Sequence, residues 1–171
     1  MRNRLAGIAF ILLAALVVTV SAFVYDSAQQ TVGQTITNVA TITLKNSALG
    51  DIYEGETKSY TKTGVAELGS AISLTTAKTD VYLHLDSDVD SLDTYYTDYT
   101  ITVKFITVPG GSSHSVGQTA ATMSIAAPDP SAITLDAAGS WAFDFEISTT
   151  ADAVSSDQAT TVTIDVTAES S

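Results

Sequence analysis

Cysteine is absent from this chain, and positively charged residues are scarce. The 171 residues include seven lysines and arginines against 19 aspartates and glutamates. Without cysteine the protein forms no disulfide, no thiolate metal site and no cysteine nucleophile. Both arginines, Arg2 and Arg4, precede residue 5, so the part after residue 25 sets five lysines against all 19 acidic residues, a net charge of −14. Such a field repels nucleic acid, and we expect no nucleic-acid partner.

Long apolar runs are also rare, and the one present divides the chain. Residues 5–25, LAGIAFILLAALVVTVSAFVY, carry no charge. A helix needs about 20 such residues to cross a bilayer. The arginines on the preceding side favour a cytoplasmic flank and an exported remainder. We therefore predict a basic leader and hydrophobic helix in residues 1–30, placed as a single pass in the cell membrane or in a filament core, and an extracytoplasmic domain in residues 31–171.

Two processing sites are compatible with this apolar run. Val20-Ser21-Ala22 fits a secretory cleavage site, with Phe23 as the mature start. The run is longer than the core of an ordinary signal peptide, about 7 to 15 residues, which favours a retained anchor instead. Arg4-Leu5-Ala6-Gly7 followed by Ile8 resembles the class III signal of prepilins, in which a peptidase cuts after the small residue and the apolar segment stays on the mature protein. The sequence therefore leaves three alternatives open: cleavage after Ala22, cleavage after Gly7, or an anchor that is not cut.

Strong helix formers are few after residue 30, where threonine, serine, valine and alanine dominate. Apolar residues there alternate with polar ones, the period of a strand with one buried face. The pattern predicts about eight strands, at residues 31–44, 56–62, 71–76, 80–85, 99–105, 119–125, 141–147 and 162–166. With one helical turn expected at 65–70, these strands predict a mainly β fold, an antiparallel β-sandwich or jelly roll. The inward-facing residues predicted to form the core are Tyr99, Ile101, Val103, Phe105, Trp141, Phe143, Phe145, Ile147, Val162, Ile164 and Val166.

Two families of surface filaments resemble parts of this sequence. Residues 1–30 resemble an archaeal type IV pilin or archaellin, with a short basic leader, a small residue at Gly7 and an apolar helix that ends in AFVY. In that family the helix packs into the filament core and a β-sandwich faces outward. The stretches AFVYD, VGQTIT and TITLK, at 22–26, 32–37 and 41–45, are similar to the mature start of TasA/camelysin-type fibre subunits. Those subunits are jelly rolls that polymerise by giving an N-terminal strand to the next subunit.

These features together predict a non-enzymatic structural subunit of an extracellular filament or surface layer, which is a homo-oligomer. Assembly would use the hydrophobic helix, or the threonine-rich strand at 31–44 added to a neighbour's sheet. No cofactor is expected. The side chains predicted to carry assembly are Ile8, Phe10, Leu12, Leu16, Phe23, Tyr25, Ile36, Ile42 and Leu44.

The acidic loop at residues 86–96 is the candidate ligand site. Carboxylates at alternate positions can place oxygen ligands around Ca²⁺. The candidate ligands are Asp86, Asp88, Asp90 and Asp93. Ser91 stands where an EF-hand loop requires glycine, and Thr97 where it requires glutamate, so a solvated acidic loop is the other interpretation. The rival function is a membrane-anchored extracellular module that binds Ca²⁺, or a glycan against Tyr95 and Tyr96.

Residues with catalytic chemistry are not grouped in the sequence. The two imidazoles are His84, which alternates outward from an apolar strand face, and His114, which lies in a glycine- and serine-rich loop. No Gly-x-Ser-x-Gly elbow is present to expose a nucleophilic serine. We therefore predict that the protein is not an enzyme.

Overall fold

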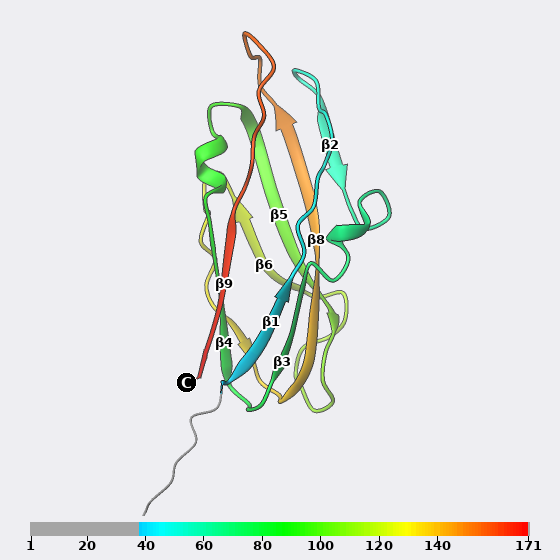
Figure 1. Cartoon of the computed structure of the whole chain (residues 1–171), viewed down its shortest axis with the longest axis vertical. Helices are drawn as coiled ribbons and strands as arrows, with labels where there is room; N and C mark the ends of the chain where they lie inside the picture. Colours follow the sequence, from blue (N-terminus) through cyan, green and yellow to red (C-terminus); the bar gives the residue numbers. More distant parts are fainter. Residues whose placement is uncertain (1–37, 171) are drawn as a thin grey trace, which may run out of the picture. The chain divides into compact units, whose positions relative to one another are not determined.

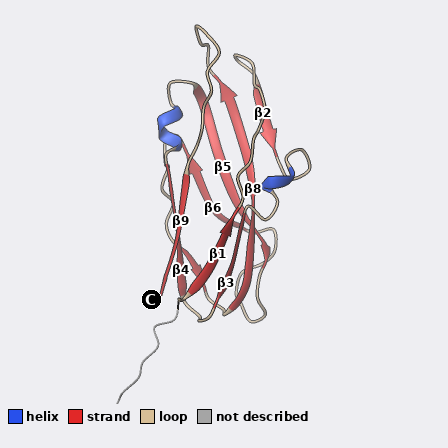
Figure 2. Ribbon diagram, viewed as in Figure 1, coloured by secondary structure: helices blue, strands red, loops and turns tan. Residues whose placement is uncertain are grey.

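The computed structural model describes residues 38–170, which form a mainly β structure (Figures 1 and 2). This part of the chain contains nine strands and two short 3-10 helices. In chain order they are β1 (Ala40–Leu44), β2 (Thr57–Tyr60), η1 (Ala66–Leu68), β3 (Ile72–Thr76), β4 (Val81–Ser87), η2 (Val89–Leu92), β5 (Tyr96–Thr107), β6 (Thr119–Ser124), β7 (Ile133–Leu135), β8 (Gly139–Ala151) and β9 (Ile164–Ser170). The predicted mainly β class is confirmed for these residues.

The larger sheet is built around β8, a strand of 13 residues. Its order is β1-β3-β8-β5-β6, and every pairing is antiparallel. The same edge of β8 pairs first with β3 and, further along, with β2, whose Tyr60 lies opposite Ile147. β5 and β8 show the clearest alternation in the sequence because most of their apolar side chains face the core and most of their polar ones face outward.

The smaller sheet has the order β7-β4-β9 within residues 38–170, again antiparallel. Side chains of both sheets belong to one hydrophobic core. Trp141, Phe105 and Phe143 come from the larger sheet, and Leu83 and Leu135 come from the smaller one. Each such side chain stabilises the fold by about 1.5–3 kcal/mol when fully buried.

The predicted core is correct for seven residues, which are buried: Tyr99, Ile101, Val103, Phe105, Trp141, Phe143 and Ile147. The other four are only partly buried, although they pack against the same core: Phe145, Val162, Ile164 and Val166. Three of these four belong to β9 or its approach. The incomplete burial therefore concentrates near one edge of the smaller sheet.

Several boundaries differ from the sequence-based prediction. The predicted loop at 86–96 contains the end of β4 and the helix η2, so Asp86 and Ser87 are strand residues. The prediction missed β7, which has three residues and follows the Pro128–Pro130 break, and it ended the last strand at Val166 although β9 extends to Ser170. The turn at 65–70 is present as η1.

The predicted hydrophobic helix and both processing sites lie outside the described residues, as does the first half of the strand predicted at 31–44. The helices found between residues 38 and 170 are single turns, none with the length and apolar character required to cross a membrane.

Candidate functional site

β1 forms one edge of the larger sheet. It pairs with β3 from Ala40 opposite Thr76 to Leu44 opposite Ile72, and no described residue pairs with its other edge. Ala40 and Ile42 point toward the core and are partly buried, whereas Thr41 and Thr43 are exposed. β-branched residues favour this extended backbone, which leaves a row of peptide groups unpaired along the outer edge.

β9 forms the corresponding edge of the smaller sheet. It pairs with β4 from Ile164 opposite Ser87 to Ser170 opposite Val81, and its other edge is unpaired within the described chain. Its inward-facing residues are Ile164, Val166 and Ala168, all partly buried against the core. They alternate with exposed Asp165, Thr167 and Glu169.

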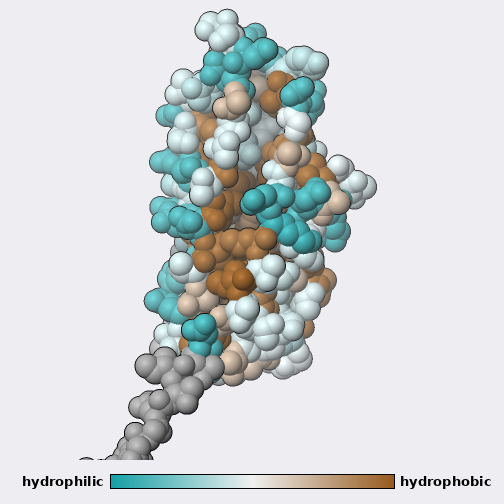
Figure 3. Space-filling view, in the orientation of Figure 1, coloured by the Kyte–Doolittle hydropathy of each residue, from teal (hydrophilic) through white to brown (hydrophobic). Residues whose placement is uncertain are grey.

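The two unpaired edges face a common strip of apolar surface. In Figure 1 β1 and β9 are both drawn on the viewer's side and run in opposite directions, and neither is paired along its outer edge within the described residues. Figure 3 shows apolar side chains gathered on this face. We call this strip the open seam, and define it by Ala40 and Ile42 of β1 and Ile164, Val166 and Ala168 of β9.

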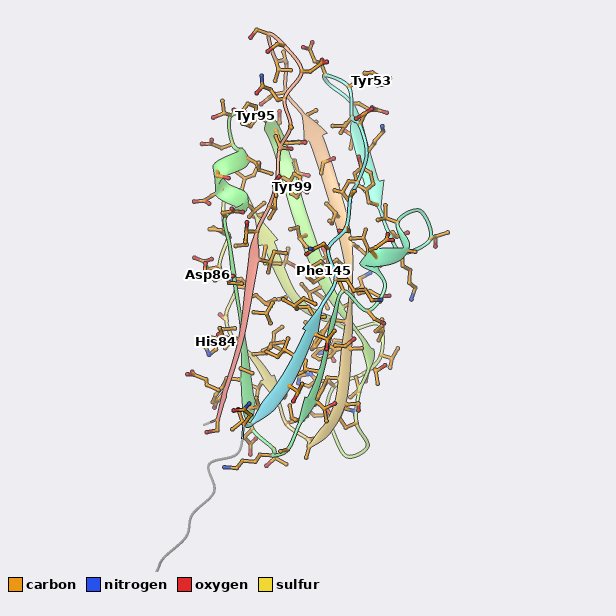
Figure 4. The ribbon with its side chains drawn as sticks, in the orientation of Figure 1. Tyr53, His84, Asp86, Tyr95, Tyr99 and Phe145 are labelled. Carbon is orange, nitrogen blue, oxygen red and sulfur yellow. The ribbon has the colours of Figure 1, made fainter. Side chains whose placement is uncertain are left out.

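Aromatic residues lie deeper along the same side of the molecule. Figure 4 places Phe145 and Tyr99 between β9 and the β1–β2 segment in this view. Burial, followed by the neighbouring Tyr96 and Tyr60 hydroxyls, raises the pKa of Tyr99 to about 12. Tyr99 is thus a neutral core residue. Thr149, on the inner face of β8, is 2% exposed, and its hydroxyl has no hydrogen-bond partner among the described residues.

The predicted assembly residues fall in two parts of the chain. Ile42 and Leu44 lie in β1, where Ile42 lines the open seam and Leu44, at the end of the strand, is 47% exposed. The others lie outside the described residues: Ile8, Phe10, Leu12, Leu16, Phe23, Tyr25 and Ile36. Since residues 40–44 pair within their own sheet, a strand given to another copy must come from the segment before residue 38.

The four aspartates of the predicted Ca²⁺ set point to different partners. Asp86 lies on the outer face of β4 (Figure 4), whereas the Asp88 carboxylate accepts the Thr163 N–H at 2.7 Å and ties η2 to the start of β9. Asp90 and Asp93 are exposed in and after η2. Within residues 38–170, no three His, Cys, Asp or Glu side chains are grouped so that they could hold a metal ion.

Asp86 instead meets two aspartates that sequence reasoning missed. Asp165 lies directly opposite it on β9, and Asp129 comes from the loop after β6. A hydrogen bond with the Asp129 carboxyl, followed by the charges of Asp129 and then Asp165, raises the pKa of Asp86 above its ordinary value. The three residues are far apart in sequence: the strand register places Asp165 opposite Asp86, and hydrogen bonds from Ser87 to Pro128 and Asp129 hold the loop beside them.

The other residues considered as ligand or catalytic candidates pack against, or hydrogen-bond to, neighbouring strands. Tyr96 makes an edge-to-face contact with Tyr99, and its hydroxyl hydrogen-bonds to Thr160 at 3.0 Å. Tyr95 is half-buried before β5. His84 faces outward, as predicted, and its Nε2 lies 3.0 Å from a Glu169 carboxylate oxygen.

His114 closes one end of the core. Its ring stacks on Phe105 with centroids 4.6 Å apart, and its Nε2 hydrogen-bonds to the Thr134 carbonyl at 2.8 Å. Beside it, Asp136 accepts hydrogen bonds from the Ser112 hydroxyl and from Ser113. These bonds hold the loop between β5 and β6 against β7.

Comparison of the chain with protein-family models and with curated proteins finds no match.

Proposed function

We propose that this protein is a non-enzymatic structural subunit of an extracellular filament or surface layer. The observation that carries the proposal is the open seam. In this proposal the two sheets are the layers of a β-sandwich of the jelly-roll type. The seam is the side of the sandwich on which no strand pairs with the edges of β1 and β9. An apolar strip between two unpaired strand edges favours the addition of a strand.

The proposed occupant is the segment before residue 38 of a second copy. In an extended strand its residues Val32, Gln34 and Ile36 would share one face, and Thr31, Gly33, Thr35 and Thr37 would share the other. Seven residues, 31–37, span about 23 Å when extended. β1 has five residues and β9 has seven, so the lengths are compatible.

A helix-core mode of assembly is the other form of the same proposal, and it requires Ile8 to Tyr25 in the mature chain. Strand addition requires only the segment before residue 38. The seam supports strand addition. N-terminal sequencing of the subunit purified from surface material separates the two: a start at Ile8 fits the helix core, and one at Phe23 fits strand addition alone.

Electron microscopy of surface material tests the function itself. We expect filaments or a lattice from the full-length chain. Ile42→Asp should abolish them, because the charge enters the apolar seam, while Thr43→Asp, on the opposite face of the same strand, should not. Recovery of the unaltered protein only as membrane-bound monomers would overturn the proposal and favour the anchored binding module.

A further inference from the structure

Thr149 is a buried polar residue whose side chain has no hydrogen-bond partner within residues 38–170. It lies between Ile147 and Ala151 on the face of β8 that points into the core. Tyr60, opposite Ile147 on β2, is a near neighbour, but no hydrogen bond joins its hydroxyl to that of Thr149. Folded proteins rarely leave a buried polar group unpaired, because the group loses its hydrogen bonds to water. A partner from outside the described residues would remove this cost.

The position of Thr149 is next to the open seam. Thr149 pairs with Tyr99 of β5, which Figure 4 draws between β9 and the β1–β2 segment. One rung further, the Tyr96 hydroxyl is hydrogen-bonded to Thr160, four residues before the first seam residue of β9. This bond holds the chain that leads into β9 beside the same rungs. A strand that lies along the seam therefore has apolar side chains beside most of its length and the Thr149 hydroxyl near one end.

The segment before residue 38 has a matching polar side chain. Of Val32, Gln34 and Ile36, which would share the inward face of an added strand, only Gln34 is polar. Its amide group can both donate and accept hydrogen bonds, as can the hydroxyl of Thr149. Gln34 would lose its bonds to water in an apolar seam, so it also requires a partner there. Each group can satisfy the other.

We propose that the Gln34 side chain of the incoming segment hydrogen-bonds to the Thr149 hydroxyl of the receiving copy, and that this contact sets the register of the added strand. The inference rests on the proposed strand addition and names the residues that give it specificity. A slip of one residue would turn Gly33 and Thr35 inward. A slip of two would place Val32 or Ile36 at the hydroxyl and leave Gln34 unpaired among apolar side chains. A single buried polar contact can fix register in this way.

A double-mutant cycle on the full-length chain tests the contact, with the protein concentration needed for filament formation as the readout. Gln34→Leu and Thr149→Val should each raise that concentration about tenfold, because each leaves one buried group without its partner. The double variant removes both groups and should need no more than either single variant. Gln29→Leu, at a position of the opposite parity, and Thr102→Val, on the outer face of β5, are the matched controls and should have little effect.

The melting temperature of the unassembled chain supplies a second readout. Thr149→Val should not lower it, since the hydroxyl has no partner there. A clear fall would show that the hydroxyl is already bonded within the single copy, and would overturn the proposal.

The assembly outcomes separate this proposal from the proposed function. If the unaltered chain forms filaments and the two single effects multiply in the double variant, or if Gln34→Leu assembles as the unaltered chain does, the contact is wrong while the filament function stands. If the unaltered chain forms no filament, both are overturned.

Discussion

At the scale of single residues, Phe143 and Phe145 separate the closed core from the open seam. They occupy alternate positions on the inner face of β8, yet Phe143 is fully buried and Phe145 only partly. We expect Phe143→Ala to lower the free energy of unfolding by about 3–5 kcal/mol. Phe145→Ala should cost about half as much, because part of its ring is already in contact with solvent. Urea unfolding of monomeric protein measures both, and equal costs would mean that the seam is closed in solution.

Asp136 should make the loop between β5 and β6 sensitive to acid. Hydrogen bonds from the Ser112 hydroxyl, then from the side chain and backbone N–H of Ser113, lower the pKa of Asp136 well below its ordinary value. A carboxylate with a lowered pKa contributes stability above its unfolded pKa, about 3.9, and loses it as pH falls through the folded value. Asp136→Asn should therefore lower the urea midpoint at pH 7 and have little effect at the lowest pH at which the chain still folds. Asp157→Asn, at an exposed position, controls for the change of charge.

At the scale of elements, Asp144 fastens η1 to the centre of the larger sheet. Its buried carboxylate accepts the Ser70 N–H at 2.7 Å and pairs with Lys62 at 2.7 Å. Asp144→Ala leaves the partly buried Ser70 N–H without its partner and should destabilise the fold by about 2 kcal/mol. Glu146 lies two residues further along β8 and forms a more exposed ion pair with Lys104. Glu146→Ala, which removes that pair, should cost less than about 1 kcal/mol. Similar losses from thermal unfolding of the two variants would contradict this.

The register of β9 on β4 carries an unfavourable pair. Asp86 and Asp165 lie directly opposite each other on the outer face, and like charges in that arrangement weaken a sheet. Asp165→Asn should therefore raise the melting temperature at neutral pH by a small amount. Glu67→Gln, which makes the same change of charge on η1, should leave it unaltered.

The elements that the sequence predicts well are those with long alternation. β5 and β8 alternate over many residues because one face of each is buried. β7 has three residues, too few to show a period. The end of β9 is mostly polar, so its sequence does not show the alternation of apolar residues that would predict a strand. Threonine-rich β1 was predictable as a strand for its β-branched residues.

Only the β1 side of the candidate site could be predicted, because the β9 side depends on which strands become edges. The threonine-rich strand made Ile42 a predicted assembly residue, whereas Val166 reads as an ordinary inward-facing core residue. Only the pairing of β1 with β3 and of β9 with β4 shows that each of these strands has one unpaired side within the described residues. The same applies to Asp129, which reaches Asp86 only through the fold, whereas the acidic loop was visible from its composition.

At the scale of the whole molecule, the seam gives each copy one place to receive a strand. It offers backbone edges and apolar side chains to that strand. In this account each copy gives its segment before residue 38 once and receives one segment in its seam, as an open filament requires.

The central claim is that the seam receives the segment before residue 38 of another copy, and the absence of cysteine permits a direct measurement. Copies carrying only Ile36→Cys are mixed with copies carrying only Ile164→Cys, Val166→Cys or Ala168→Cys, assembled and oxidised. We predict a disulfide-linked dimer containing one chain of each kind for at least one seam position. Thr167→Cys, on the opposite face of β9, should give none. No mixed dimer from any seam position, with an internal disulfide in a chain that carries both cysteines, would show that the segment folds into its own seam and would contradict the account.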